Sequence, residues 1–182
     1  MFTEPPPVPV ADPHTEWQAR KQKLAGLHQW SATGRVAIRT EKEAWNVGMR
    51  WRQQRDNYRI RFHAPLALGT AEIIGTPRGV QLRTNRETLS APDPEALLRR
   101  VMGWHIPLSG LRNWILGRPE AGVPEETVEI DAAGRLMRLR QSGWEIRYLA
   151  YRRIGEMVLP TRLTLENARF RARVRISRWR LP

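Results

Sequence analysis

Residues 45–63 read WNVGMRWRQQRDNYRIRFH, and this stretch decides the fold. On both sides of its polar middle, apolar and polar side chains alternate with a period of two, which is the pattern of a strand with one buried face. The residues between the two halves, Gln54-Arg55-Asp56-Asn57, have the composition of a turn. The sequence therefore predicts a hairpin whose aromatic side chains face one way and whose arginines face the other.

The same alternation continues along the chain in both directions. It predicts strands at 35–39, 45–52, 58–63, 68–74, 80–83, 127–131, 135–141, 144–151, 161–167 and 169–179. In the last of these the alternation slips by one residue before Trp179, so we expect a bulge near Ser177-Arg178.

Three segments have the period of an amphipathic helix. The first runs from Pro13 to Trp30. The second begins with Asp93 as N-cap and Pro94 in the first turn and ends at Gly103. The third extends over 107–117. Helices this short are not stable alone, and a sheet of ten or eleven strands curls or closes. We therefore expect the helices on the concave face of that sheet.

The domain organisation is simple. Residues 1–13 are rich in proline and typical of an extended tether, and 14–182 have the length of a single domain. No apolar run approaches the roughly 18 residues that span a bilayer. Met1 leads directly into the tether without the features of a signal peptide. The alternatives are a cytosolic protein or, as the bare Met1 suggests, a mature form without its targeting segment.

Composition narrows the function classes. The chain has no cysteine, which excludes disulfides, thiolate zinc sites and thiol nucleophiles. Its 31 Lys and Arg against 18 Asp and Glu give a net charge of +13, and only three of the cations are lysines. Such a surface attracts polyanions, either nucleic acid or an anionic membrane. A compositional habit of the source genome is the alternative explanation.

No catalytic motif is present. The histidines, His14, His28, His63 and His105, are scattered over different segments, and no pair has the spacing of metal ligands. There is no nucleophile elbow, phosphate-binding glycine loop or dinucleotide motif. Carboxylates on strands are expected to face outward and pair with arginines; these are Glu43, Glu72, Glu129 and Glu145. We expect no enzyme activity, no metal and no cofactor.

A nucleic-acid-binding domain is the second hypothesis. Arginines interleaved with aromatic residues can form a stacking platform for bases. Here, however, Tyr58 and Phe62 alternate with Arg59 and Arg61, so the two types lie on opposite faces of the strand. A platform requires both on one face.

Two apolar features remain. The chain contains eight tryptophans, which indicate either an ordinary core or an adaptable apolar cavity. They are Trp17, Trp30, Trp45, Trp51, Trp104, Trp114, Trp144 and Trp179. Leu66 and Leu68 lie in a loop between strands, where side chains are normally polar. They either tuck back into the core or face outward toward a membrane or partner.

A family resemblance emerges from the order and spacing of several short elements. These are Trp30 with Gly34-Arg35, Trp45 with Trp51, Tyr58 with Pro65-Leu66, His105-Ile106-Pro107-Leu108 with Leu111, Trp114 and Gly117, Gln141-Ser142-Gly143-Trp144 with Tyr148 and Tyr151, Leu159-Pro160-Thr161-Arg162, and Trp179. Residues 28–181 thereby resemble the LolB family, outer-membrane lipoproteins that receive lipoproteins from a periplasmic carrier and insert them into the outer membrane.

The resemblance implies a mainly β fold with α elements: an unclosed antiparallel barrel of about eleven strands, with three helices covering its concave interior. It also implies an apolar cavity for acyl chains. The residues expected to line that cavity are Trp45, Met49, Trp51, Tyr58, Phe62, Leu97, Val101, Met102, Trp114, Ile115, Trp144, Ile146 and Tyr148. The implied partners are lipoprotein acyl chains, a LolA-like carrier and outer-membrane lipid. A monomer on the periplasmic face of the outer membrane is expected.

The sequence departs from the family pattern at two places. The family anchors itself through a lipidated N-terminal cysteine, which is absent here; on this interpretation Met1 replaces the anchor and Pro5–Pro13 is the tether. The family also has a protruding loop with a leucine after a proline, usually followed directly by glycine. Here Ala67-Leu68 precede Gly69, so either Leu66 or Leu68 is the expected membrane-inserting residue.

Overall fold

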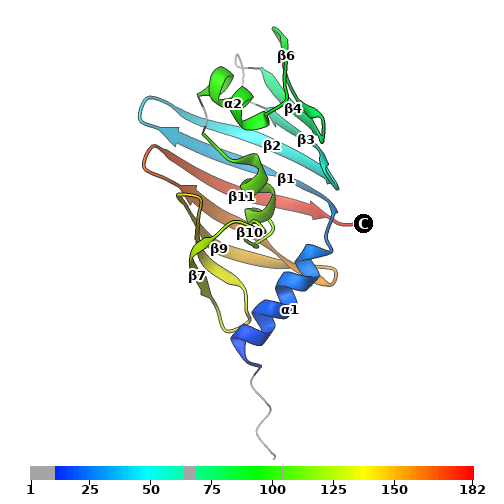
Figure 1. The fold of residues 1–182 in the computed structure, drawn as a ribbon, viewed down its shortest axis with the longest axis vertical. Coiled ribbons are helices and arrows are strands. Elements are labelled where there is room, and N and C mark those ends of the chain that lie inside the picture. The colour runs from blue at the N-terminus through cyan, green and yellow to red at the C-terminus, as the bar shows by residue number, and fades with distance from the viewer. Residues whose placement is uncertain (1–10, 64–68, 104) are drawn as a thin grey trace, which may run out of the picture.

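The computed structural model describes residues 11–63, 69–103 and 105–182, and its elements form one sheet with helices on one face (Figure 1). The helices are α1 (Pro13–Ala25), α2 (Pro94–Met102) and α3 (Leu108–Trp114). The strands are β1 (Gln29–Thr40), β2 (Ala44–Gln54), β3 (Asn57–His63), β4 (Thr70–Thr76), β5 (Gly79–Thr84), β6 (Thr88–Ala91), β7 (Glu125–Ile130), β8 (Leu136–Gln141), β9 (Trp144–Ile154), β10 (Met157–Glu166) and β11 (Phe170–Arg180).

The eleven strands form an antiparallel sheet in the order β6-β5-β4-β3-β2-β1-β11-β10-β9-β8-β7. Neighbours in the sheet are neighbours in sequence, except that β1 pairs with β11 and so joins the two halves of the chain. The edge strands β6 and β7 do not pair with each other, so the sheet stays open. This confirms the expected unclosed antiparallel sheet of about eleven strands with three helices.

The pairing of β1 with β11 contains the expected irregularity. Thr33 pairs with Arg178 and Gly34 with Ile176, which leaves Ser177 as the extra residue of a bulge. The Ser177 hydroxyl donates a 3.0 Å hydrogen bond to the Thr33 carbonyl. The two backbones approach so closely here that a Cβ on Gly34 would overlap the carbonyl of Arg175, and only glycine fits.

The core lies between the sheet and the helices that cover it. Buried side chains alternate along the central strands, as in β11, where every inward residue from Phe170 to Ile176 is buried and the arginines between them are exposed. Helix α1 contributes Trp17 and Leu24 to this core. Its Arg20 Nη2 donates to the Val158 carbonyl at 2.7 Å and ties the helix to β10. In the predicted hairpin, Trp51 is buried whereas Arg50 and Arg52 are exposed, which confirms that aromatic residues and arginines face opposite sides.

Several element boundaries differ from the sequence-based expectations, and one strand was not expected. The first helix ends at Ala25 rather than at Trp30, because Trp30 already belongs to β1 and pairs with Gln53 of β2. The third helix spans only Leu108–Trp114. The short strand β6 was not expected; it forms because it pairs with β5 at the sheet edge. The expected end of α2 at Gly103 is confirmed, and Gly103 adopts the left-handed conformation of a C-cap.

Candidate functional site

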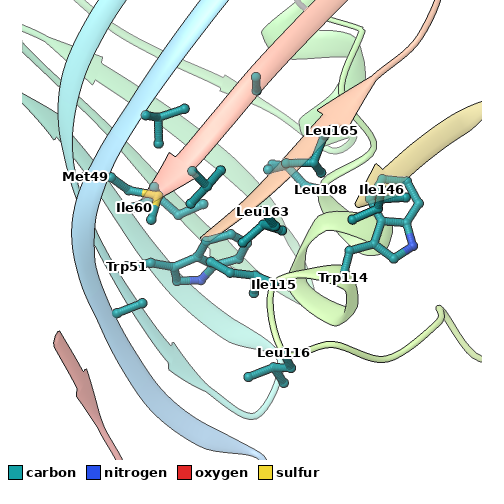
Figure 2. Close-up of a cluster of buried hydrophobic side chains, with 14 of the residues drawn as sticks. Met49, Trp51, Ile60, Leu108, Trp114, Ile115, Leu116, Ile146, Leu163 and Leu165 are labelled. Atoms are coloured by element: carbon teal, nitrogen blue, oxygen red, sulfur yellow. The ribbon is translucent and has the colours of Figure 1, made fainter. Parts of the chain in front are cut away.

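A small apolar cavity lies between the centre of the sheet and the segment that carries α2 and α3. Its volume is about 60 Å³. Figure 2 shows side chains from the sheet, including Met49 and Trp51, together with Leu108 and Ile115 of the helical segment. The lining residues are Val36, Ile38, Met49, Trp51, Ile60, Phe62, Ile73, Leu98, Ile106, Leu108, Leu111, Ile115, Trp144, Leu163, Leu165, Phe170, Ala172 and Val174. All of these side chains are apolar or aromatic, so the cavity offers hydrophobic contact.

The polar groups near the cavity are bonded to protein. Trp51 Nε1 donates to Gln53 Oε1 at 3.0 Å, and Gln53 Nε2 donates to the Arg55 carbonyl at 2.6 Å. Both side chains are buried. Because the indole N–H already has its acceptor, Trp51 presents hydrocarbon to the interior.

The C-terminal end of α3 is fixed by a buried polar cluster. Trp114 Nε1 donates to Gln141 Oε1 at 2.8 Å, and the hydroxyl of Tyr148 donates to the Trp114 carbonyl at 2.8 Å. Gln141 also accepts from the Glu120 N–H and donates to the Glu120 and Val123 carbonyls. Burial raises the pKa of the Tyr148 phenol, which keeps it a donor. This end of the helix therefore cannot move without breaking several buried hydrogen bonds.

The N-terminal part of α3 is held more weakly. Ser109 Oγ donates to Glu95 Oε1 of α2 at 3.3 Å, and Arg112 pairs with the exposed Asp56 at 3.4 Å. Burial raises the pKa of the Glu95 carboxyl, so its ionised form is not strongly stabilised there. The N-cap position, Pro107, makes no side-chain capping bond. Contacts of this kind contribute little to stability.

A larger hollow of about 1,090 Å³ lies on the other side of α3, but its chemistry is different. Its lining mixes charged groups of both signs, including Lys21, Arg112 and Glu120, with apolar side chains such as Leu27 and Trp30. The charged groups would have to lose water against a hydrocarbon ligand, which makes this hollow less suited to such a ligand than the wholly apolar cavity. The apolar cavity is therefore the candidate site, although it is the smaller space.

Comparison with known proteins decides the family. The sequence profile described as "Outer membrane lipoprotein LolB" matches residues 28–179. The chain belongs to the LolB family. Curated relatives named "Outer-membrane lipoprotein LolB" include proteins from Nitrosococcus oceani, 42% identical over 96% of this chain and 88% of the relative, and Alkalilimnicola ehrlichii, 37% identical over the same shares.

Solved structures agree on the fold of this LolB-family protein. A LolA superfamily protein from Nitrosomonas europaea aligns with a TM-score of 0.56 at 11% identity, covering 94% of both chains. A DUF1329 family protein from Desulfovibrio piger aligns with a TM-score of 0.60 at 8% identity, again over 94% of both. At such low identity the likeness concerns the fold alone.

The structure distributes the predicted cavity residues over three environments. Those that line the cavity are Met49, Trp51, Phe62, Ile115 and Trp144. Those buried elsewhere in the surrounding core are Leu97, Trp114, Ile146 and Tyr148, and those partly buried against it are Trp45, Tyr58 and Val101. The side chain of Met102 and both loop leucines, Leu66 and Leu68, lie outside what the structure describes.

Two of these placements have clear physical causes. Tyr58 packs over Gly75 of the neighbouring strand, where a Cβ would collide with its ring. Burial there raises the pKa of Tyr58 to about 12. The Trp114 indole donates to Gln141 and its ring lies 6.4 Å from that of Trp144, behind the cavity lining.

Sequence reasoning missed most of the aliphatic lining. Ile60, Leu163, Ala172 and others occupy inward positions of strands that the alternation does predict. Alternation shows that a residue faces inward, but not which inward residues from different strands meet. That depends on the strand order, above all on the pairing of β1 with β11.

Proposed function

We propose that this LolB-family protein receives the acyl chains of lipoproteins between its sheet and the α2–α3 segment, and delivers them into the outer membrane. The observation that carries the proposal is the wholly apolar cavity enclosed by these elements. The relatives are named outer-membrane lipoproteins, which supports a lipid-anchored position at the outer membrane. A LolA-like carrier is the proposed source of the cargo.

The cavity as it stands is the closed state of the site. Pockets for drug-sized ligands measure about 300–1,000 Å³, several times the 60 Å³ found here. An acyl chain therefore enters only if the walls separate. The sheet is held by continuous backbone hydrogen bonds, whereas α2 packs on the edge strands β5 and β6. The α2–α3 segment is the wall that moves.

The energetics favour transfer through such an interior. Burial of each methylene is worth about 0.8 kcal/mol, so acyl chains need continuous shielding on their way through water. An apolar site without hydrogen bonds to the ligand binds chains of different lengths. It also releases them to a bilayer, which offers the same contacts without the cost of opening the protein. No covalent bond changes in this process, so the proposed activity is not enzymatic.

Filling the cavity tests the proposal. Ala172 lines the cavity on β11, whereas Ala37 lies on the outer face of β1, opposite Arg173. Ala172→Leu should weaken binding of a fluorescent fatty acid by about tenfold, because the added carbons occupy the ligand's space, at a stability cost of about 1–3 kcal/mol. Ala37→Leu is the matched control and should bind normally. Binding is followed by fatty-acid fluorescence, and folding by circular dichroism.

Equal binding by both folded variants would contradict the proposed location. Loss of binding in Ala37→Leu but not in Ala172→Leu would place the ligand on the outer face. Absence of fatty-acid binding by the unmodified protein would contradict acyl-chain uptake itself.

A further inference from the structure

The outer face of the sheet, opposite the helices, carries arginines directly beside one another. Arg175 of β11 pairs with Arg35 of β1 on one side and with Arg162 of β10 on the other. Arg173 lies two residues before Arg175 in β11 and therefore on the same face. Arg178 and Arg50 both pair with Thr33. We call Arg35, Arg50, Arg162, Arg173, Arg175 and Arg178 the arginine band; all are exposed.

In the part of the chain that the structure describes, the members of the arginine band lack acidic partners, whereas several arginines nearer the edges of this face have them. Toward one edge, Glu72 pairs with Arg59, Arg61 and Arg83. Toward the other, Glu145 pairs with Arg138 and Arg147. Within the described ranges, no member of the band forms an ion pair. Like charges directly opposite each other on adjacent strands are destabilising. The band therefore costs the folded state stability and is suited to an anionic partner.

An exposed apolar side chain lies on the same side of the sheet, next to the band. Leu149 of β9 is 59% exposed, and its neighbour Ala150 pairs with Arg162. Cations next to an exposed apolar side chain match the interface of an anionic bilayer, where headgroups carry charge and the region beneath is apolar.

We propose that the arginine band binds the anionic headgroups of a membrane surface. The outer face of the sheet then lies on the lipid, and the face covered by the helices turns toward the aqueous side (Figure 1). In this orientation the α2–α3 segment is accessible to a carrier that arrives through water. Nucleic acid fits less well, because the sheet aromatics that would stack on bases point into the core. The inference rests on the outer surface and is independent of acyl-chain uptake.

The test compares two triple variants that each lose three positive charges. Arg35→Gln/Arg173→Gln/Arg175→Gln removes the centre of the band. The control, Arg78→Gln/Arg86→Gln/Arg100→Gln, removes exposed arginines from two hairpin turns and from α2. Binding is measured by co-sedimentation with vesicles of phosphatidylglycerol and phosphatidylethanolamine, and with phosphatidylcholine vesicles for comparison. Each arginine near an anionic surface contributes about fivefold, so the band variant should bind about a hundredfold more weakly.

The control variant should keep most of its binding to the anionic vesicles, and the unmodified protein should bind phosphatidylcholine poorly. Equal losses in both variants would show that net charge alone is responsible and would overturn the proposal. So would tighter binding to single-stranded DNA than to the vesicles at the same salt concentration.

Two further measurements distinguish membrane binding by the band from a structural role of its arginines and from acyl-chain uptake. Because the band variant relieves repulsion, its midpoint of urea unfolding should be unchanged or higher; a lower midpoint would indicate that these arginines have a structural role and would count against a binding surface. Fatty-acid binding should be unaffected in the band variant. If the unmodified protein bound vesicles but took up no fatty acid, only the proposed function would be contradicted.

Discussion

Gln141 is a single polar residue that organises one end of an apolar interior. It is fully buried. Its side-chain amide accepts hydrogen bonds from the Trp114 indole and the Glu120 N–H, and donates to the carbonyls of Glu120 and Val123. It thereby joins α3, the segment leading to β7, and the end of β8. Its carboxamide has both donors and an acceptor, and the groups that meet at this junction require both.

Replacing Gln141 by leucine should destabilise the fold more than removing any one of its partners. Gln141→Leu leaves several buried donors and acceptors unpaired, and we expect a loss of about 3 kcal/mol in the free energy of unfolding. Trp114→Phe removes only the indole N–H and should cost about 1 kcal/mol for the lost hydrogen bond, plus any loss of packing. Urea denaturation of both variants measures the difference. Equal costs would mean that Gln141 contributes only its bond to Trp114.

The sequence pattern assigned most strand side chains to the correct face of the sheet, buried or exposed. Glu72 is an instructive exception. It was expected to be a solvated outward group paired with arginine; it is paired with Arg59, Arg61 and Arg83 but is buried beneath them. Alternation identifies the face of the sheet, whereas the long arginine side chains that cover a carboxylate come from neighbouring strands.

At the scale of elements, α2 and α3 differ in how they are anchored. The buried cluster around Trp114 holds the end of α3, while its beginning meets α2 through the 3.3 Å contact of Ser109 with Glu95. Helix α2 is well capped by Asp93 and Gly103, so it is expected to move as an intact helix. The opening of the site is therefore expected to pivot about the C-terminal end of α3.

This pivot predicts a gradient in hydrogen exchange. Amides of α2 and of the first turn of α3 should exchange about tenfold or more faster than those of the central strands β1 and β11, because opening the wall exposes them without unfolding the sheet. Addition of a fatty acid should accelerate exchange in α2 further and leave β1 unchanged. Exchange is followed by mass spectrometry of peptides. Protection of α2 equal to that of β1 would contradict a moving wall.

The elements that sequence predicted well are those with strong local signals. The strand pair at 45–63 has uninterrupted alternation, and α2 has both an N-cap aspartate and a C-cap glycine. The end of α1 was wrong by several residues because Leu27 continues the helical period after the chain has left the helix. The four-residue strand β6 has too little sequence to show a period and depends on its pairing with β5.

For the whole molecule, the leucine loop between β3 and β4 remains a prediction, since 64–68 lie outside the described residues. Leu66→Glu/Leu68→Glu should leave folding and fatty-acid binding intact but reduce delivery of a lipoprotein from a LolA-like carrier to membrane vesicles by at least about tenfold, because glutamate is costly in the apolar part of a bilayer. The matched control is Ala132→Glu/Ala133→Glu in the exposed β7–β8 turn. Normal delivery by the loop variant would contradict a membrane-inserting role.

None of the helices in the described ranges has the length and hydropathy needed to cross a membrane. Contact with lipid is proposed at two surfaces, the arginine band and the leucine loop. The two contacts need not be made at the same time, because they suit different steps of receiving and delivering cargo.

The sequence by itself determined which side of each strand faces inward and where the arginines point. These properties follow from a period of two between neighbouring residues and need no long-range information. The tertiary structure decided which inward residues meet. Pairing of β1 with β11 brings Val36 and Ile38 beside Ala172 and Val174, and α3 closes over them to leave a cavity. The same pairing places Arg35 beside Arg175 on the outer face, so the cavity and the arginine band both arise from one contact between the first and last strands.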